Sequence, residues 1–191
     1  MRRAFWVVVS VLAASSSAYA ENGIYVGASL GPSRAVSWCE DNTGDCEDVA
    51  LGWKAYMGTQ FHPNWAIEAA FVDLGEFTAT DTSGGFPIDA EAEVTGFNIA
   101  AIGILPMSPT FAFLGRFGVI LSSLDIQASG GGQSASDRAS NTSLAVGLGA
   151  RVGITDRVFA RVEWERFADI GDDETGQDDV DFLSVGLGMA F

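Results

Sequence analysis

The amino-acid sequence predicts an all-β protein, an eight-stranded antiparallel up-and-down transmembrane β-barrel. Three observations predict this fold. Bulky apolar residues alternate with small or polar ones in eight segments, and the connections between these segments are alternately short and long. The chain of 191 residues also has 23 Gly beside 13 Phe and 5 Trp. Glycine disfavours helices, since each one in a helix interior costs roughly 1 kcal/mol.

Each alternating segment is close to the length of about 9–11 residues that a tilted strand needs to cross a bilayer. The eight segments are residues 23–31, 51–61, 65–74, 94–105, 111–121, 143–154, 158–166 and 182–191. Three connections are short (62–64, 106–110 and 155–157), and four are long and polar (32–50, 75–93, 122–142 and 167–181). Strict alternation places the short turns at one end and the long loops at the other, as in barrels of the bacterial outer membrane.

The two rows of each strand differ in size. In segment 143–154, Leu144, Val146 and Leu148 belong to a bulky row, whereas the other row holds small residues and Arg151. A water-soluble barrel would face solvent with a row dense in charged and polar residues, but here that row is mostly Gly, Ala and Ser. We therefore expect the bulky row to face lipid and the small row to fill the narrow lumen. Aromatic residues near the strand ends are expected at the two membrane interfaces: Trp53, Phe71 and Trp164 on the loop side, and Phe61, Trp65, Phe111 and Phe191 on the turn side.

Charged residues in the small row are expected to pair with each other inside the barrel, because an unpaired buried charge costs several kcal/mol. The predicted interior ion-pair network consists of Lys54, Glu68, Arg116, Arg151, Arg161, Glu163 and Glu165. Two interpretations require the same residues. The network is either a satisfied polar core or a salt-bridge gate on a thin water path.

The first twenty residues, MRRAFWVVVSVLAASSSAYA, have the features of a cleaved signal peptide: two arginines, a short apolar stretch and a small-x-small cleavage site. We expect residues 1–20 to be removed and residues 21–191 to form the barrel domain. Cys39 and Cys46 are the only cysteines. In an oxidising exported compartment they predict a local disulfide that holds one loop.

Several functional classes do not fit the sequence. A net charge of −15 argues against nucleic-acid binding, which depends on Lys and Arg. The only histidine, His62, lies in a short turn, and no GxSxG or HExxH motif occurs, so neither an enzyme nor a cofactor is expected. The long loops are acidic. Two interpretations of this acidity remain open. It either provides solubility and protects strand edges, or it provides a calcium site in which an ion is shared with anionic lipopolysaccharide, with Asp172, Asp173, Asp178 and Asp179 as candidate ligands.

Three stretches carry a resemblance to a known family: GIYVGASLG (23–31), GWKAYMGTQFHPNWAIEAAFVDLG (52–75) and FLSVGLGMAF (182–191). Together they resemble the OmpA-like transmembrane domain, a family of eight-stranded outer-membrane barrels. The resemblance implies that Phe191 is part of the C-terminal signal read by the barrel-assembly machinery. It also implies interior pairing of Lys54, Glu68, Arg161 and Glu163. It covers the barrel without the periplasmic peptidoglycan-binding domain of longer members, so it does not imply cell-wall tethering.

From these observations we expect an exported, integral protein of the Gram-negative outer membrane with a structural or surface-interaction role. The alternative is a narrow, low-conductance, porin-like channel gated by the interior salt bridges. The expected partners are outer-membrane lipid and lipopolysaccharide, with the barrel-assembly machinery and periplasmic chaperones acting during biogenesis. A closed barrel has no free edge that requires pairing, so a monomer is expected.

Overall fold

The computed structural model describes residues 23–39, 45–83, 86–130, 133–172 and 176–191. Every regular element in these ranges is a β-strand. The strands are β1 (Gly23–Ala35), β2 (Cys46–Glu47), β3 (Val49–His62), β4 (Trp65–Ser83), β5 (Phe86–Pro106), β6 (Phe111–Gly130), β7 (Gln133–Gly153), β8 (Val158–Asp172) and β9 (Gly176–Ala190). Within the described part of the chain, no helix is long and apolar enough to cross a membrane.

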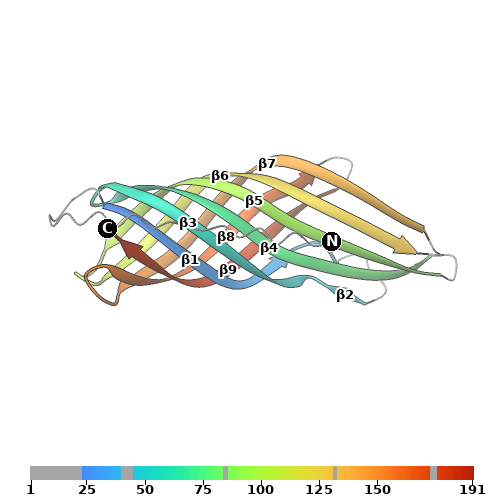
Figure 1. Cartoon of the computed structure of the whole chain (residues 1–191), viewed down its shortest axis with the longest axis horizontal. Helices are drawn as coiled ribbons and strands as arrows, with labels where there is room; N and C mark the ends of the chain where they lie inside the picture. The colour runs from blue at the N-terminus through green and yellow to red at the C-terminus, as the bar shows by residue number, and fades with distance from the viewer. Residues whose placement is uncertain (1–22, 40–44, 84–85, 131–132, 173–175) are drawn as a thin grey trace, which may run out of the picture.

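Eight of the described strands close into one antiparallel barrel (Figure 1). β1 and β3 to β9 pair in chain order, and β1 pairs with β9 to close the sheet, with Leu30 opposite Val185. The two-residue β2 pairs with the far part of β4, where Cys46 lies opposite Ala79. The predicted eight-stranded up-and-down barrel is confirmed.

The strands are longer than the sequence predicts, which corrects the predicted long connections. β5 and β7 each have 21 residues and β6 has 20, about twice the roughly 9–11 residues that cross a bilayer. The β4–β5 pairing continues to Ser83 opposite Phe86. Connections 75–93, 122–142 and 167–181 are therefore mostly paired strand. The barrel therefore has a second, long part beyond the half that carries the short turns (Figure 1). We call this part the extended end; it consists of the described residues of 32–50, 75–93, 122–142 and 167–181.

A bulge in β4 changes the phase of the strand where the extended end begins. Leu74 faces the lumen, and the next fully buried position is Phe77 rather than residue 76. Gly75 supplies the extra residue with a φ of 81°, a conformation that glycine adopts without steric cost. Its N–H donates to Asp73 Oδ1 at 2.9 Å. The bulge therefore places Phe77 inside and leaves Glu76 exposed.

A second bulge has the same effect in β8. Phe167 and Ile170 both face the lumen, although they lie three residues apart. Asp169, between them, has a φ of 52° and is exposed. Two side chains on β7 hold its carbonyl in place: Ser143 Oγ donates to it at 2.9 Å and Asn141 Nδ2 at 3.0 Å. In β4 and β8 these two shifts in phase conceal the alternation, so the sequence predicts loops there. In 122–142 the polar, Gly-rich composition has the same effect, because β6 and β7 pair through it without a shift in register.

Large apolar side chains cover the outer wall of the short-turn half, as the sequence predicts. On β7, Leu148 is 67% exposed, and on β9, Val185 and Leu187 are 59% and 58% exposed. Inward positions of the same strands, such as Ala145 and Ser184, are buried. A soluble barrel would have the opposite arrangement, so the membrane orientation is confirmed.

An aromatic group on the outer wall lies where a membrane interface is expected. The rings of Trp53 and Phe71 are 5.5 Å apart, and those of Phe71 and Phe97 are 5.3 Å apart, across β3, β4 and β5. Trp53 Nε1 donates to Asp73 Oδ2 at 3.1 Å. A ring in apolar surroundings with its N–H at a polar group is typical of the membrane–water boundary.

The lumen is not filled by small residues alone, which corrects the sequence-based expectation. Near the short turns, Tyr25, Tyr56 and Phe159 point inward and are 6%, 4% and 7% exposed. The glycines of the small row make room for these rings, because a Cβ there would collide with them. Tyr25 lies over Gly58, Tyr56 over Gly27 and Phe159 over Gly188. Glycine and ring are thus complementary across neighbouring strands.

Candidate functional site

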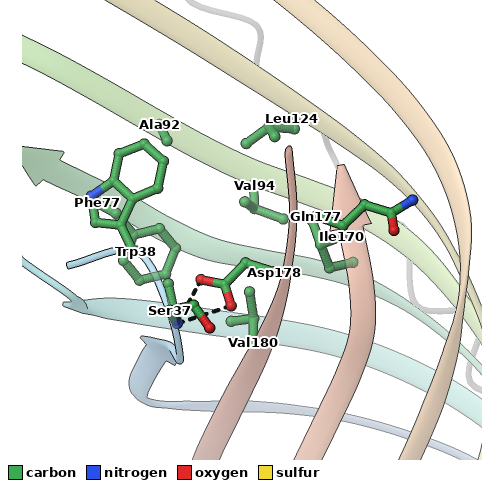
Figure 2. A pocket seen from close by; sticks show the side chains of 11 residues that line it. Ser37, Trp38, Phe77, Ala92, Val94, Leu124, Ile170, Gln177, Asp178 and Val180 are labelled. Atoms are coloured by element: carbon green, nitrogen blue, oxygen red, sulfur yellow. Dashed lines mark hydrogen bonds between the residues drawn. The ribbon is translucent and has the colours of Figure 1, made fainter. Parts of the chain in front are cut away.

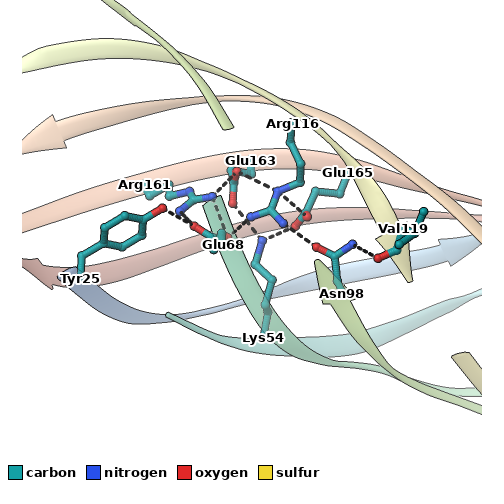
Figure 3. A network of polar contacts seen from close by, with 9 residues as sticks. All are labelled: Tyr25, Lys54, Glu68, Asn98, Arg116, Val119, Arg161, Glu163 and Glu165. Atoms are coloured by element: carbon teal, nitrogen blue, oxygen red, sulfur yellow. Dashed lines mark hydrogen bonds and ion pairs between the residues drawn. The ribbon is translucent and has the colours of Figure 1, made fainter. Parts of the chain in front are cut away.

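Six of the seven charged residues predicted to face the lumen meet in one network (Figure 3). Three of them, Arg161, Glu163 and Glu165, occupy consecutive inward positions of β8, because side chains of a strand alternate between its two faces. The others come from β3, β4 and β6. The members are Lys54, Glu68, Arg116, Arg161, Glu163 and Glu165, each at most 5% exposed.

Lys54 and Arg116 each pair with more than one carboxylate of the network. Lys54 Nζ lies 2.9 Å from Glu163 Oε2 and also contacts the carboxylate of Glu165. Arg116 Nε lies 3.0 Å from Glu165 Oε1, and its Nη2 contacts Glu68. Arg116 Nε also lies 3.7 Å from Glu163 Oε1, so Lys54 joins two carboxylates and Arg116 joins three.

Arg161 pairs with Glu68 and with Glu163. Its Nη1 lies 2.7 Å from Glu68 Oε2, and its Nη2 lies 2.6 Å from Glu163 Oε1. The guanidinium carbon lies 4.7 Å from the centre of the Tyr56 ring, within the range of a cation–π contact. Arg161 thus connects β8 to β4 across the lumen while one face of its guanidinium lies on an aromatic ring.

Two neutral residues that the sequence analysis did not single out complete the network. Tyr25 Oη donates to Glu68 Oε2 at 3.1 Å. Asn98 Oδ1 accepts from Arg116 Nη1 at 2.7 Å, and Asn98 Nδ2 donates to the carbonyl of Val119 at 3.1 Å. Both residues lie in the inward phase of their strands, so the two-residue period could have found them. The sequence analysis did not single them out because both are uncharged at neutral pH.

The charges of the network balance: three cations face three carboxylates, all of them buried. Desolvating six charges is expensive, and the mutual attraction offsets this cost only with good geometry and complete pairing. Removing any one partner would leave a net buried charge. The six charged residues therefore tie β3, β4, β6 and β8 together, and Tyr25 and Asn98 add β1 and β5. They fill the middle of the lumen with polar contacts that depend on each other.

Arg151 does not join this network, which corrects its assignment to it. No carboxylate lies within ion-pair distance of Arg151 among the described residues. Its guanidinium carbon lies 5.5 Å from the centre of the Phe159 ring instead. Arg151 and Arg161 are opposite each other on β7 and β8. Their different surroundings depend on the carboxylates across the lumen, which the sequence pattern does not reveal.

Apolar side chains occupy the lumen on both sides of the network. The aromatic group of Tyr25, Tyr56 and Phe159 lies toward the short turns. Toward the extended end lie Leu74, Phe77, Phe167 and Phe182, each no more than 2% exposed. The described lumen on either side of the network is thus arranged in layers that are apolar, ionic and apolar again.

The extended end carries the disulfide. Cys39 and Cys46 are bonded, with an S–S distance of 2.03 Å, which confirms the predicted pair. Cys46 begins β2, which pairs with β4, so the disulfide attaches the segment after β1 to the barrel wall. Two residues before Cys39, Ser37 N donates to both carboxylate oxygens of Asp178 on β9, at 2.9 and 3.0 Å. The segment is therefore anchored at two points.

The predicted calcium ligands are only partly described. Asp173 and the side chain of Asp172 lie outside the described residues. Asp178 accepts from Ser37 N, and Asp179 Oδ1 accepts from Asp169 N at 3.1 Å. Among the side chains that the structure describes, no group of three His, Cys, Asp or Glu residues is arranged to hold a metal ion. Calcium binding remains a prediction.

The model of the outer membrane protein beta-barrel domain family matches residues 4–191. The chain belongs to this family. No curated protein matches the chain significantly.

Solved structures of other outer membrane barrels share its fold. Neisserial surface protein A is 14% identical with a TM-score of 0.60, covering 88% of this chain and 97% of that one. The attachment invasion locus protein Ail of Yersinia pestis is 18% identical with a TM-score of 0.56, covering 89% and 97%. The N-terminal β-barrel domain of Pseudomonas aeruginosa OprF is 12% identical with a TM-score of 0.52, covering 88% and 97%.

Membership of this family places the protein in the Gram-negative outer membrane. In such barrels the short turns face the periplasm, so the extended end of this outer membrane protein faces the exterior. The predicted signal peptide, residues 1–20, lies outside the described residues. Phe191 is 55% exposed, and its backbone N–H donates to the carbonyl of Ile24 at 2.9 Å. Its role in assembly remains a prediction.

Proposed function

We propose that this outer membrane protein has a structural and surface-interaction role, in which the extended end makes contacts outside the cell and the lumen does not serve as an open pore. The observation that supports this best is the combination of a packed lumen with strands that continue far past the membrane. A narrow eight-stranded barrel has just enough interior space for side chains. The part of the molecule left for interaction is then its outer surface.

The outer wall of the extended end is acidic. Glu76, Glu91 and Glu93 are exposed on the β4–β5 hairpin, and Glu76 lies directly opposite Glu93. None of these three glutamates forms an ion pair with a described basic residue. The arginines of this end are already paired, Arg34 with Asp48, Arg138 with Asp125, and Arg166 with Asp181. The charge available to a partner is therefore negative.

This charge selects the chemistry of the partner. One solved structure of Yersinia pestis Ail holds the heparin analogue sucrose octasulfate, a polyanion. The acidic wall described here would repel such a ligand, so for this protein we propose positively charged groups on the contacted surface. Lipopolysaccharide, which is anionic, would then require bridging divalent cations.

Binding of charged polymers to the protein in lipid nanodiscs tests this proposal. We expect an oligolysine peptide to bind with an affinity that falls as salt is added, and heparin not to bind. The triple variant Glu76→Gln, Glu91→Gln, Glu93→Gln should weaken oligolysine binding, whereas Asp156→Asn in a periplasmic turn should not. Equal binding by the triple variant and the unmodified protein would contradict an acidic contact surface on this hairpin.

We further propose that the remaining predicted partners act on this protein in the usual way for its family: outer-membrane lipid around the barrel, and the barrel-assembly machinery and periplasmic chaperones during biogenesis. The protein is proposed to be a monomer. We assign it no enzymatic activity and no cofactor. His62 is exposed at the end of β3, where its Nδ1 accepts from Asn64 N at 3.2 Å.

A narrow channel gated by the interior salt bridges is a second candidate. It is favoured by the polar character of the lumen, where the hydroxyls of Ser29 and Ser184 are buried without a protein partner among the described residues. Water is able to satisfy such groups. Planar-bilayer recordings separate the two candidates. The structural role predicts no conductance steps for the unmodified protein or for Arg161→Ala, whereas a gated channel predicts small steps that become larger or longer-lived in Arg161→Ala.

A further inference from the structure

We propose that the extended end binds one small apolar molecule inside the barrel: an alkyl chain of about eight carbons, carrying an uncharged head group with an oxygen acceptor. This ligand site goes beyond the surface-contact role proposed above, because it lies in the lumen rather than on the outer wall. It rests on a cavity, on the two bulges that shape its lining, and on the tryptophan that closes it.

A partly open cavity of about 210 Å³ lies in the extended end (Figure 2). Its wall is mainly apolar, and its lining includes Phe77, Val94, Leu124, Ile170 and Val180, each at most 8% exposed. An apolar cavity of about 150 Å³ stays dry and accepts benzene, and by proportion a cavity of this size accepts roughly eight carbon atoms.

The bulges determine which residues line this cavity. Without the bulge at Gly75, the inward position after Leu74 would be taken by Glu76 instead of Phe77. Without the bulge in β8, the position after Phe167 would be taken by Asp169 instead of Ile170. Each bulge therefore excludes a carboxylate from the lumen and places an apolar side chain in the cavity wall. Bulges commonly re-aim side chains next to functional sites.

Trp38 closes one side of the cavity, beside Phe77 and Ala92 in Figure 2. It is held on both flanks. The next residue, Cys39, is disulfide-bonded to Cys46, and the preceding residue, Ser37, donates to Asp178. The disulfide thus has a specific consequence, which is to fix an aromatic side chain over an apolar space.

The polar groups around the cavity select the head group of the ligand. Trp38 Nε1 is buried without a hydrogen-bond acceptor among the described residues, so it is a donor available to a ligand oxygen. Asp178 and Gln177 lie at the mouth. The carboxylate of Asp178 and the acidic outer wall disfavour an anionic head group, such as that of a fatty acid. An alcohol or an ester fits both conditions.

Fluorescence quenching by 8-bromooctan-1-ol tests the proposal. The processed protein is purified from outer membranes as the variant Trp53→Phe, Trp65→Phe, Trp164→Phe, so that Trp38 is the remaining tryptophan, and is placed in lipid nanodiscs. We expect the brominated alcohol to quench Trp38 emission in a saturable manner. In a second arm no alcohol is added, and the bilayer phospholipids carry bromine on their acyl chains.

Two substitutions on β5 distinguish binding in the cavity from collisions with Trp38. Ala92→Leu fills the cavity and should weaken binding, which raises the half-saturating concentration of the alcohol by roughly tenfold or more. Ala101→Leu makes the same change on the lipid-facing wall and should leave it unchanged. Heat-dependent electrophoretic mobility reports whether each variant is folded. Ala35→Val, a smaller filling on β1, replaces Ala92→Leu if the latter does not fold.

Saturable quenching that is lost in the cavity-filled variant supports the site. Saturable quenching by the free alcohol, without quenching by brominated phospholipid, indicates that the natural ligand is a diffusible molecule. If bilayer phospholipid with brominated chains also quenches Trp38, acyl chains of the membrane reach the indole, and the proposal of an uncharged ligand held in the lumen is overturned. Absence of saturable quenching in both arms, or equal quenching in Ala92→Leu and Ala101→Leu, would overturn the proposal.

Discussion

The stability of the barrel should depend strongly on Arg161, because this residue completes the charge balance of the lumen. The Arg161→Ala substitution removes contacts of 2.7 Å to Glu68 and 2.6 Å to Glu163. Three buried carboxylates would then face two cations, Lys54 and Arg116. Breaking a buried ion pair by removing one partner typically costs about 3–5 kcal/mol, mostly because the other charge remains desolvated. We expect a loss of this size in the free energy of unfolding.

Arg151→Ala is the matched control. The residue lies opposite Arg161 on the neighbouring strand, points into the same lumen and undergoes the same truncation. It has no ion-pair partner among the described residues and loses mainly its contact with the Phe159 ring. Such a cation–π contact contributes about 0.5–2 kcal/mol. The two variants should therefore differ by about 1–4.5 kcal/mol.

Urea-induced unfolding in lipid vesicles, followed by tryptophan emission, measures both variants. The fraction of folded protein can be checked by electrophoresis of unheated samples. The reasoning fails if Arg161→Ala is no less stable than Arg151→Ala, because the charge balance of the network would then contribute nothing. Equal large losses for both would also refute it, since they would show that Arg151 has a partner of similar strength.

Three further predictions follow from the packing and from the sequence. Gly186→Ala should destabilise the barrel by about 1–3 kcal/mol, because its Cβ would collide with the backbone of β1, whereas the Cβ of Gly115→Ala meets nothing within 4 Å; equal urea midpoints would contradict this. Replacing both Cys39 and Cys46 by Ser should leave the barrel folded, since a ring with a sequence separation of 7 contributes at most about 2.5 kcal/mol. Protease cleavage between the two positions should become faster, and an unfolded product would show that the disulfide supports the whole fold. Phe191→Ala should reduce the amount of folded protein in isolated outer membranes; an unchanged amount would argue against an assembly role for the terminal residue.

The lumenal network shows which features of the site the sequence predicts and which it does not. The two-residue period correctly placed all six network members on the inward face, because alternation is a local property of an extended chain. It could not assign partners. Lys54 and Glu165 meet only because the barrel closes with a particular stagger between β3 and β8. The same limit explains Arg151, which occupies an inward position and has no ion-pair partner in the part of the chain that the structure describes.

The extended end shows a different limit. In β4 and β8 the period-2 alternation changes phase at the bulges, where Gly75 and Asp169 each add a residue. A stretch of alternating residues that changes phase reads as a polar loop. The pairing of β4 with β5 and of β8 with β9 restores regular strands on both sides of each bulge. Hydrogen bonding between neighbouring strands, which the sequence of one strand does not show, decides this.

The sequence by itself determined the number of strands, their order, the disulfide and the face of each strand that meets lipid. These properties follow from local alternation and from the insolubility of charged groups in hydrocarbon, which act on each segment independently. The tertiary structure decided how far the strands continue, which charges pair and where the lumen leaves a cavity. Those properties depend on the stagger of strands that are distant in the chain, and that stagger is fixed only when the barrel closes.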